Sequence, residues 1–282
     1  MAKADLHIHT VASDGHMQPE DVVRNAKRHK LDIISITDHD TIRGYQKAKE
    51  KAQELDIELI PGAEITSDFN GRECHLLAYC FDPDHQEIKR LVARHYHSRL
   101  KRGKWILNEL SKEGILIDID EVKAEANGGN IGRPHIAAVL INKGYVASFK
   151  EAFIRYLSDE SLGTIENEYY THHEVIETVK KAGGAVIVAH PGNLYNKDEL
   201  AELVEAGVDG IEYIHPSHSY KTQKWVEAFA DEHNLLKTGG SDFHGGDKEY
   251  QKFFGVVTIN AKYVHRLKRM TDQRKKISVQ GL

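Results

Sequence analysis

The sequence predicts an α/β fold built on a parallel sheet, open or closed into a barrel, with a helical insertion near its middle. Short apolar runs alternate repeatedly with helical patterns, which is typical of parallel α/β folds. The alternation stops between about residues 85 and 161, where the sequence predicts helices and no strand. A chain of 282 residues fits one large domain or a domain with an insertion.

The first part of the chain alternates strands and helices. Pro19 opens a helix to about residue 30, and Thr41 is positioned to cap a second helix that ends near residue 55. The run Asp-Ile-Ile-Ser-Ile-Thr at 32–37 is typical of a buried strand. Strands are expected at 4–9, 32–37, 57–65 and 74–81.

The middle of the chain is predicted to be helical. Apolar residues at helical spacing indicate a long helix ending at Gly114, and Pro134 and Ser148 each begin another. We therefore expect residues 1–98 and 166–282 to form the main domain. Residues 99–165 are expected to form a small helical insertion that covers the active site, because they follow the strand that carries His75.

The last part of the chain returns to alternation. Thr171-His-His-Glu174 is a capping-box pattern, and the helix it starts should end at Gly183 and Gly184. Strands are expected at 185–189, 210–214, 235–239 and 256–259. The basic stretch after Lys262 is predicted to be a solvated terminal helix.

Composition limits the classes of function. Hydrophobic residues make up 40% and charged residues 29%, which excludes disordered, collagenous and membrane classes. Apolar runs fall far short of the ~18 residues that span a bilayer, and the N-terminus has no apolar signal segment. Two cysteines cannot form a disulfide framework, so we expect a cytoplasmic protein. A net charge of −5 argues against a broad electrostatic grip on nucleic acid, so neither a stable nucleic-acid complex nor a membrane partner is expected.

Histidines are unusually frequent and are placed at strand ends. The chain has 18 of them, and His7 and His9 lie two apart on a strand, so that their side chains point the same way. In parallel α/β folds the carboxyl ends of the strands form the active-site rim. Eight of nine candidate ligands occupy such ends or the following turns, and the ninth, His75, begins a strand. The nine are His7, His9, Asp14, His39, Glu64, His75, His190, Asp242 and His244.

Nine ligands are too many for one ion and suit two or three. Mixed imidazole and carboxylate ligands favour Mn²⁺, Zn²⁺ or Fe²⁺. Three divalent ions with three carboxylates leave a positive centre that attracts anions and lowers the pKa of bridging water. Phosphate-ester hydrolysis is therefore the first hypothesis, and amide hydrolysis by a binuclear site is the second.

The ordered motifs resemble those of the PHP (polymerase and histidinol phosphatase) family of phosphoesterases. The resemblance runs from residue 5 to 245 and is carried by Asp-Leu-His-Ile-His, Thr-Asp-His-Asp, Pro-Gly-Ala-Glu, Ala-His-Pro and Gly-Ser-Asp-Phe-His-Gly. It implies a distorted (β/α)7 barrel whose two or three divalent ions are Mn²⁺ first, with Zn²⁺ or Fe²⁺ possible. The implied ligand sets are His7, His9, Glu64 and Asp242; Asp14, His39 and His244; and Glu64, His75 and His190. Catalysis through the bound metals is implied for Asp14, His39, Glu64, His190, Asp242 and His244.

The insertion resembles that of a stand-alone, TrpH-like subgroup through Gly-Arg-Pro-His at 132–135. A second motif, Gly-Ile-Glu-Tyr-Ile-His at 210–215 in the main domain, resembles the same subgroup. That subgroup includes 3′,5′-nucleoside bisphosphate phosphatases and a 5′→3′ exoribonuclease. The resemblance implies a metal-dependent phosphoesterase that uses a metal-activated hydroxide. It would remove phosphate from a small nucleotide or nucleotides from short oligonucleotide 5′ ends. Histidinol-phosphate phosphatase and an accessory module for nucleic acid or polymerase remain the alternatives.

Three residues are candidates for substrate binding. Arg133 and His135 lie at a helix start, where a guanidinium and free backbone N–H groups can hold a phosphate. His218 is a third candidate for phosphate contact. Asp38 adjoins His39 and is a candidate either for orienting a ligating imidazole or for capping.

Overall fold

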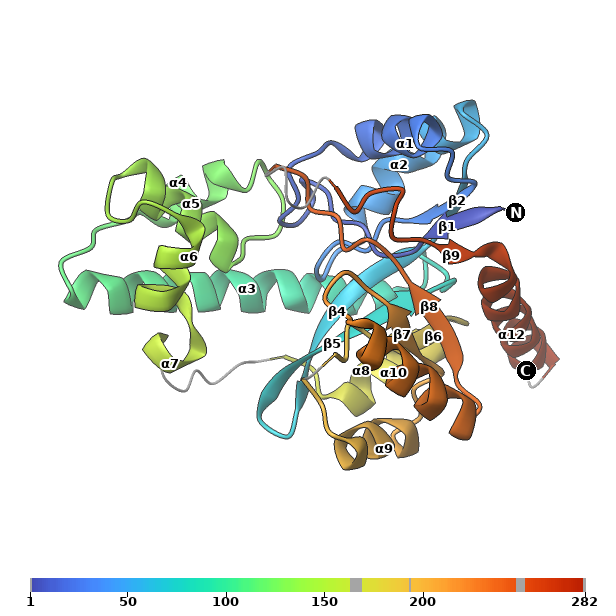
Figure 1. Ribbon diagram of the computed structural model, residues 1–282. Coiled ribbons are helices and arrows are strands. Elements are labelled where there is room, and N and C mark those ends of the chain that lie inside the picture. The colour runs from blue at the N-terminus through green and yellow to red at the C-terminus, as the bar shows by residue number, and fades with distance from the viewer. Residues whose placement is uncertain (1, 163–168, 193, 247–251, 281–282) are drawn as a thin grey trace.

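The computed structural model describes residues 2–162, 169–192, 194–246 and 252–280, and it has an α/β fold with two sheets (Figure 1). The first sheet has the order β3-β2-β1-β9. Its strands are β1 (Lys3–Asp5), β2 (Ile33–Ser35), β3 (Glu58–Ile60) and β9 (Ile259–Asn260). The second sheet has the order β4-β5-β6-β7-β8. Its strands are β4 (Gly62–Phe69), β5 (Arg72–Tyr79), β6 (Ala185–Val188), β7 (Gly210–Ile214) and β8 (Leu236–Gly239).

Isolated bridges join the two sheets at two places. Ile8 pairs with Phe243 after β1 and β8, and His39 pairs with Glu64 between the end of β2 and β4. Following strand neighbours and bridges leads from β1 through β2, β4, β5, β6, β7 and β8 back to β1. This ring is a distorted barrel, in agreement with the predicted fold class, although its ladders are continuous only within each sheet.

The β4–β5 hairpin departs from the predicted parallel pattern. The predicted strand 57–65 is two strands, because Pro61 has no N–H to donate and the chain changes sheet there. β5 is antiparallel to both β4 and β6. It therefore begins at the rim where the parallel strands end, and this explains why His75 lies near the start of its strand.

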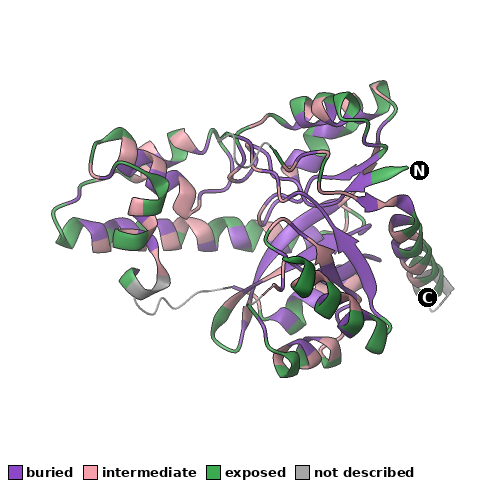
Figure 2. Cartoon of the chain, in the orientation of Figure 1, coloured by how far each residue is buried: buried purple, intermediate pink, exposed green. Residues whose placement is uncertain are grey.

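Helices surround the barrel, and most residues of the strands are buried (Figure 2). The barrel helices are α1 (Pro19–Arg28), α2 (Arg43–Glu54), α8 (His172–Lys181), α9 (Lys197–Glu205), α10 (Tyr220–Glu232) and α12 (Ala261–Gln280). The capping box that starts α8 is present: Glu174 N–H donates to Thr171 Oγ1, and Thr171 N–H donates to Glu174. The terminal helix α12 is solvated on one face only, because Val264 and Leu267 are buried against the strands.

A helical segment lies between β5 and α8 and forms a separate lobe in Figure 1. It comprises α3 (Gln86–Lys112), α4 (Ile119–Glu125), α5 (Arg133–Asn142), α6 (Phe149–Ala152), a π-helical turn (Phe153–Leu157) and α7 (Asp159–Leu162). The predicted boundary at 98/99 falls inside the continuous helix α3, and the one at 165/166 lies outside the described residues.

Within the described ranges, no helix is both long and apolar enough to cross a membrane. Both cysteines, Cys74 and Cys80, are buried free thiols.

Candidate metal centre

All nine predicted ligands come together at the barrel end to which the parallel strands point. His7 and His9 follow β1, Asp14 lies in the next turn, and His39 follows β2. Glu64 lies on β4 and His75 on β5. The remaining three follow β6 and β8: His190, Asp242 and His244.

Four of these side chains surround one point. The Nε2 atoms of His7 and His9 are 3.1 Å apart, and each lies 3.2 Å from Oε2 of Glu64. Oδ1 of Asp242 is 3.3 Å from the first nitrogen and 3.1 Å from the second. Ligand atoms about 2.0–2.1 Å from a tetrahedral ion lie roughly 3.3 Å from one another. The four atoms therefore match the first implied ligand set.

Glu64 also reaches the third implied set. Its Oε1 is 3.0 Å from Nδ1 of His75 and 2.8 Å from Nε2 of His190. Its Oε2 is 3.4 Å from Nδ1 of His39. Glu64 thus faces five imidazoles, which suits a bridging carboxylate.

The second implied set is more widely spaced. Oδ1 of Asp14 is 3.6 Å from Nε2 of His244, and its Oδ2 is 3.8 Å from Nε2 of His39. His9 joins these residues in a group whose ligand atoms all lie within 4.8 Å of one another.

The buried carboxylates of the cluster favour positive charge on the groups beside them. Burial would raise the pKa of the Glu64 carboxyl, but the imidazoles of His39 and His7 hold it well below its usual range. Burial opposes the charging of His9, yet Asp242 and Glu64 raise its pKa to about 10. Within the described part of the chain, Nδ1 of His9 and Nδ1 of His39 are buried without hydrogen-bond partners. Divalent ions would supply this charge in place of protons, so the donor set fits them.

The backbone is strained at two of the candidate ligands. His190 has a φ of 27° and Asp242 a φ of 48°, in the left-handed region that favours glycine. Non-glycine residues held in such conformations concentrate at functional sites.

Two residues of the cluster were not among the predicted ligands. His215 lies 3.2 Å from Oδ2 of Asp242 through its Nε2, and it follows β7, so the strand-end rule could have found it. Glu212 lies inside β7, is fully buried and is 3.0 Å from Nδ1 of His7. Its only signal is one carboxylate in the apolar run Gly-Ile-Glu-Tyr-Ile.

Asp38 does not orient an imidazole. It accepts hydrogen bonds from Thr10 N–H, Thr10 Oγ1 and Ser13 Oγ, so it holds the turn that carries Asp14. Of the two hypotheses for this residue, the structure supports the loop-capping one.

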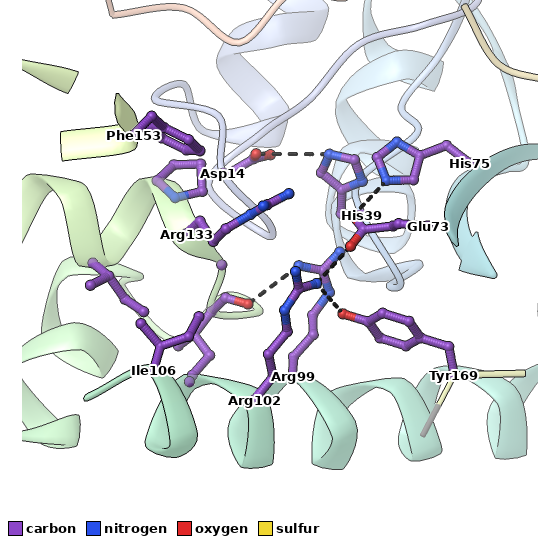
Figure 3. A pocket seen from close by; sticks show the side chains of 15 residues that line it. Asp14, His39, Glu73, His75, Arg99, Arg102, Ile106, Arg133, Phe153 and Tyr169 are labelled. Atoms are coloured by element: carbon purple, nitrogen blue, oxygen red, sulfur yellow. Dashed lines mark hydrogen bonds and ion pairs between the residues drawn. The ribbon is translucent and has the colours of Figure 1, made fainter. Parts of the chain in front are cut away.

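An arginine-lined cavity of about 160 Å³ adjoins the cluster (Figure 3). Arg99 and Arg102 enter it from α3, and Arg133 enters from α5. Arg99 donates to Asp40 at 2.6 Å, and Arg102 donates to Glu73 at 2.6 Å and to the hydroxyl of Tyr169 at 2.9 Å. The helical segment therefore brings cationic side chains directly beside the candidate ligands.

The three predicted substrate-binding residues do not line one common cavity. Arg133 donates to the carbonyl oxygen of Leu157 and lines the arginine cavity. His135 is buried, and its Nδ1 accepts from Gly132 N–H at the start of α5. His218 accepts from Gly192 N–H and donates to the carbonyl of Tyr213, so both of its ring nitrogens bind backbone.

A second cavity, of about 110 Å³, also reaches Asp14. Pro134, His135 and Phe149 line one part of it, and Glu125 and Asn127 add polar groups. Asp14 and Pro134 line both cavities, so the two cavities adjoin each other at this pair.

Comparison with known proteins agrees with this geometry. The PHP domain family model matches residues 5–206. The 5′-3′ exoribonuclease of Haemophilus influenzae is 34% identical over 248 residues, covering 86% of this chain and 90% of that protein. The 3′,5′-nucleoside bisphosphate phosphatase of Chromobacterium violaceum is 28% identical over 250 residues, covering 86% and 88%. A structure from Bifidobacterium adolescentis, assigned as a metal-dependent phosphoesterase, is 33% identical with a TM-score of 0.85, covering 95% of this chain and 96% of that one.

The chain belongs to the PHP family. It is a metal-dependent phosphoesterase of that family, as the strand-end motifs predicted.

Proposed function

We propose that this enzyme acts on nucleotides, removing phosphate from a 3′,5′-bisphosphate nucleotide or nucleotides from the 5′ end of a short RNA. The observation that carries the proposal is the arginine-lined cavity beside the ligand cluster. A cluster alone suits any phosphate ester, whereas a cationic cavity next to it suits a substrate with a second phosphate. The names of the two relatives support the same substrate class.

The nine predicted residues are proposed to hold two or three divalent ions in the three sets given above. Mn²⁺ is the favoured ion, with Zn²⁺ or Fe²⁺ as alternatives, because the donors are imidazoles and carboxylates and include no thiolate. Such ions lower the pKa of bound water and offset phosphate charge.

Residues 99–165 are proposed to act as a cap that selects the substrate. In this proposal Arg133 contacts the second phosphate, and Arg102 supports it from α3. His135, whose Nδ1 accepts from Gly132 N–H, would shape the helix start, and His218, whose two ring nitrogens bind backbone, would shape the loop beside the phosphate. The second cavity, with Phe149 and Pro134 on one side and Glu125 on another, would receive the nucleoside.

The alternatives fit less well. Histidinol phosphate carries an ammonium group, which a cavity lined by three arginines would repel. An accessory binding module does not need nine ligands converging at one end of a barrel.

A substrate screen tests the proposal. Metal-stripped protein is given Mn²⁺ and then adenosine 3′,5′-bisphosphate, a short 5′-phosphorylated RNA or histidinol phosphate. We expect turnover of one or both of the first two. Faster turnover of histidinol phosphate would replace the proposal with that activity, and no turnover of any phosphoester would favour the binding module.

A further inference from the structure

We propose that Glu212 is a positioning residue that fixes the imidazole of His7 for metal binding. It would thereby set the affinity of the ion shared by His7, His9, Glu64 and Asp242. The inference rests on the ligand sets proposed above. No ligand role was predicted for Glu212. Among the described residues, its hydrogen bonds to the cluster are with Nδ1 of His7 and the backbone N–H of His190.

Glu212 uses both of its carboxylate oxygens. Its Oε1 lies 3.0 Å from Nδ1 of His7, and its Oε2 accepts from the backbone N–H of His190 at 2.7 Å. Oε2 accepts from a backbone N–H, so the carboxyl group serves as an acceptor in this arrangement. With Oε1 also accepting, the proton of a neutral His7 ring lies on Nδ1. The lone pair of Nε2 is then directed at the cluster.

The position of Glu212 explains why so buried a carboxylate is present. Along β7, Ile211 packs in the core outside the barrel, whereas Ile214 packs against the residues inside it. Glu212 directly follows Ile211, so its side chain points to the opposite face of β7, into the barrel interior, where its exposed fraction is 0%. An unpaired carboxylate there would be costly, so the two hydrogen bonds to the floor of the metal centre account for it.

His7 and His9 differ in this support. Their Nε2 atoms lie at the same 3.2 Å from Glu64, but Nδ1 of His9 has no hydrogen-bond partner among the described residues. Of these two histidines, His7 has its tautomer fixed by a hydrogen bond at Nδ1, whereas Nδ1 of His9 lies 3.6 Å from Oδ1 of Asp14. Such partners of ligating histidines also raise ligand basicity, and their loss typically weakens metal binding about 10–100-fold.

Glu212→Gln tests this role because the amide has the shape of the carboxylate but only one acceptor oxygen in place of two. His7 Nδ1–H and His190 N–H both need an acceptor, so the amide NH₂ must oppose one of them. If it faces His7, the ring proton moves to Nε2 and that nitrogen can no longer bind metal. If it faces His190, the loop carrying a second candidate ligand is displaced.

The experiment measures metal binding without turnover. Titration calorimetry and elemental analysis with Mn²⁺ compare wild type, Glu212→Gln and Glu177→Gln, the same substitution at an exposed site on α8. We expect Glu212→Gln to weaken one metal-binding step about 10–100-fold, with smaller effects on the others, and Glu177→Gln to match wild type. Unchanged affinity in Glu212→Gln, or equal weakening of every ion, would overturn the proposal.

A second measurement covers the case in which Glu212→Gln does not fold. In Zn²⁺-loaded wild-type protein, nitrogen NMR should show His7 bound through Nε2 with a protonated Nδ1. Coordination through Nδ1 would overturn the proposal without any variant. Both readouts are independent of the proposed substrate, so an absence of phosphatase activity would reject the proposed function and leave this result standing.

Discussion

Glu64 is the side chain on which the candidate centre converges. Its two oxygens lie within 3.4 Å of nitrogens from five histidines. We expect Glu64→Ala to be the most damaging single ligand loss, because two ion positions lose a ligand together. Elemental analysis of the purified variant should show reduced metal content.

The matched control is Glu177→Ala, which removes an exposed glutamate paired with Lys181. It should keep full metal content. Undiminished metal in Glu64→Ala would reject the bridging role of this residue.

Arg133 is expected to select substrates with a second phosphate. A charge-assisted hydrogen bond contributes roughly 1.5–3 kcal/mol, so Arg133→Ala should lower kcat/KM about ten- to a hundred-fold on a 3′,5′-bisphosphate nucleotide. The loss should largely vanish on p-nitrophenyl phosphate, which lacks that group. Steady-state kinetics on both substrates measures the difference.

Arg155→Ala is the control for this variant, since Arg155 belongs to the same helical segment but pairs with Glu151 on the surface. Equal losses on both substrates would place Arg133 at the scissile phosphate or in the fold. No loss on either would leave it as a helix-start residue.

At this scale the sequence predicted the nine candidate ligands, of which Glu64 and His75 lie inside strands, but it did not predict Glu212. His7, His39 and His190 follow apolar runs, so their place at the rim could be predicted. Glu212 could not, because its role depends on which face of β7 turns inward. The hydrogen bonds of Asp38 likewise depend on how a turn folds back on it.

Among the elements, α3 is docked on the barrel by a buried polar cluster. Nδ1 of His95 lies 3.5 Å from Asp40, which also accepts from Arg99. Neither ring nitrogen of His95 has a hydrogen-bond partner among the described residues, and burial lowers the pKa of this imidazole from its ordinary 6.5, outweighing the attraction of Asp40.

The lowered pKa predicts a loss of stability in acid. Well above pH 6.5 the ring of His95 is neutral in both the folded and the unfolded chain, so it adds no pH dependence. Below about pH 6.5 the ring binds a proton in the unfolded chain but stays neutral in the folded chain, so acid favours unfolding. The free energy of unfolding should therefore fall between pH 6.5 and 5.5 by up to about 1 kcal/mol more in wild type than in His95→Gln. Urea titrations of metal-free protein measure it, and His265→Gln, at an exposed site on α12, should behave like wild type. Parallel curves for wild type and His95→Gln would contradict this account.

The order of helices and strands followed from local patterns, whereas strand direction did not. Pro19, the Thr171 capping box and Gly183 mark helix ends through contacts within a few residues. The reversal of β5 arises from pairing with β6, more than a hundred residues later, and no local pattern encodes it.

For the whole molecule, metal binding should be coupled to stability. The ligands come from six strands or the loops that follow them, so the folded state alone brings them together, and an ion at a hundredfold excess over its Kd would add about 2.7 kcal/mol. Metal-stripped protein should melt at a lower temperature, and Mn²⁺ should restore both the melting temperature and, best of the ions tested, activity. Asp242→Asn should lose much of the shift, and full activity after verified metal removal would contradict metal dependence.

The continuous helix α3 has a consequence for how this enzyme can be altered. Ile88 and Leu91 belong to the core of the barrel, while Ile106 and Leu110 belong to the core of the helical segment. One helix of roughly 40 Å thus belongs to both cores. The helical segment therefore cannot be removed or lengthened at 98/99 without interrupting α3. Engineered insertions belong instead at the exposed turns beyond it, where Gly114 and Gly144 have positive φ and open space around them. The turns at the far end of the helical segment can therefore accept insertions, whereas α3, which attaches the segment to the barrel, cannot.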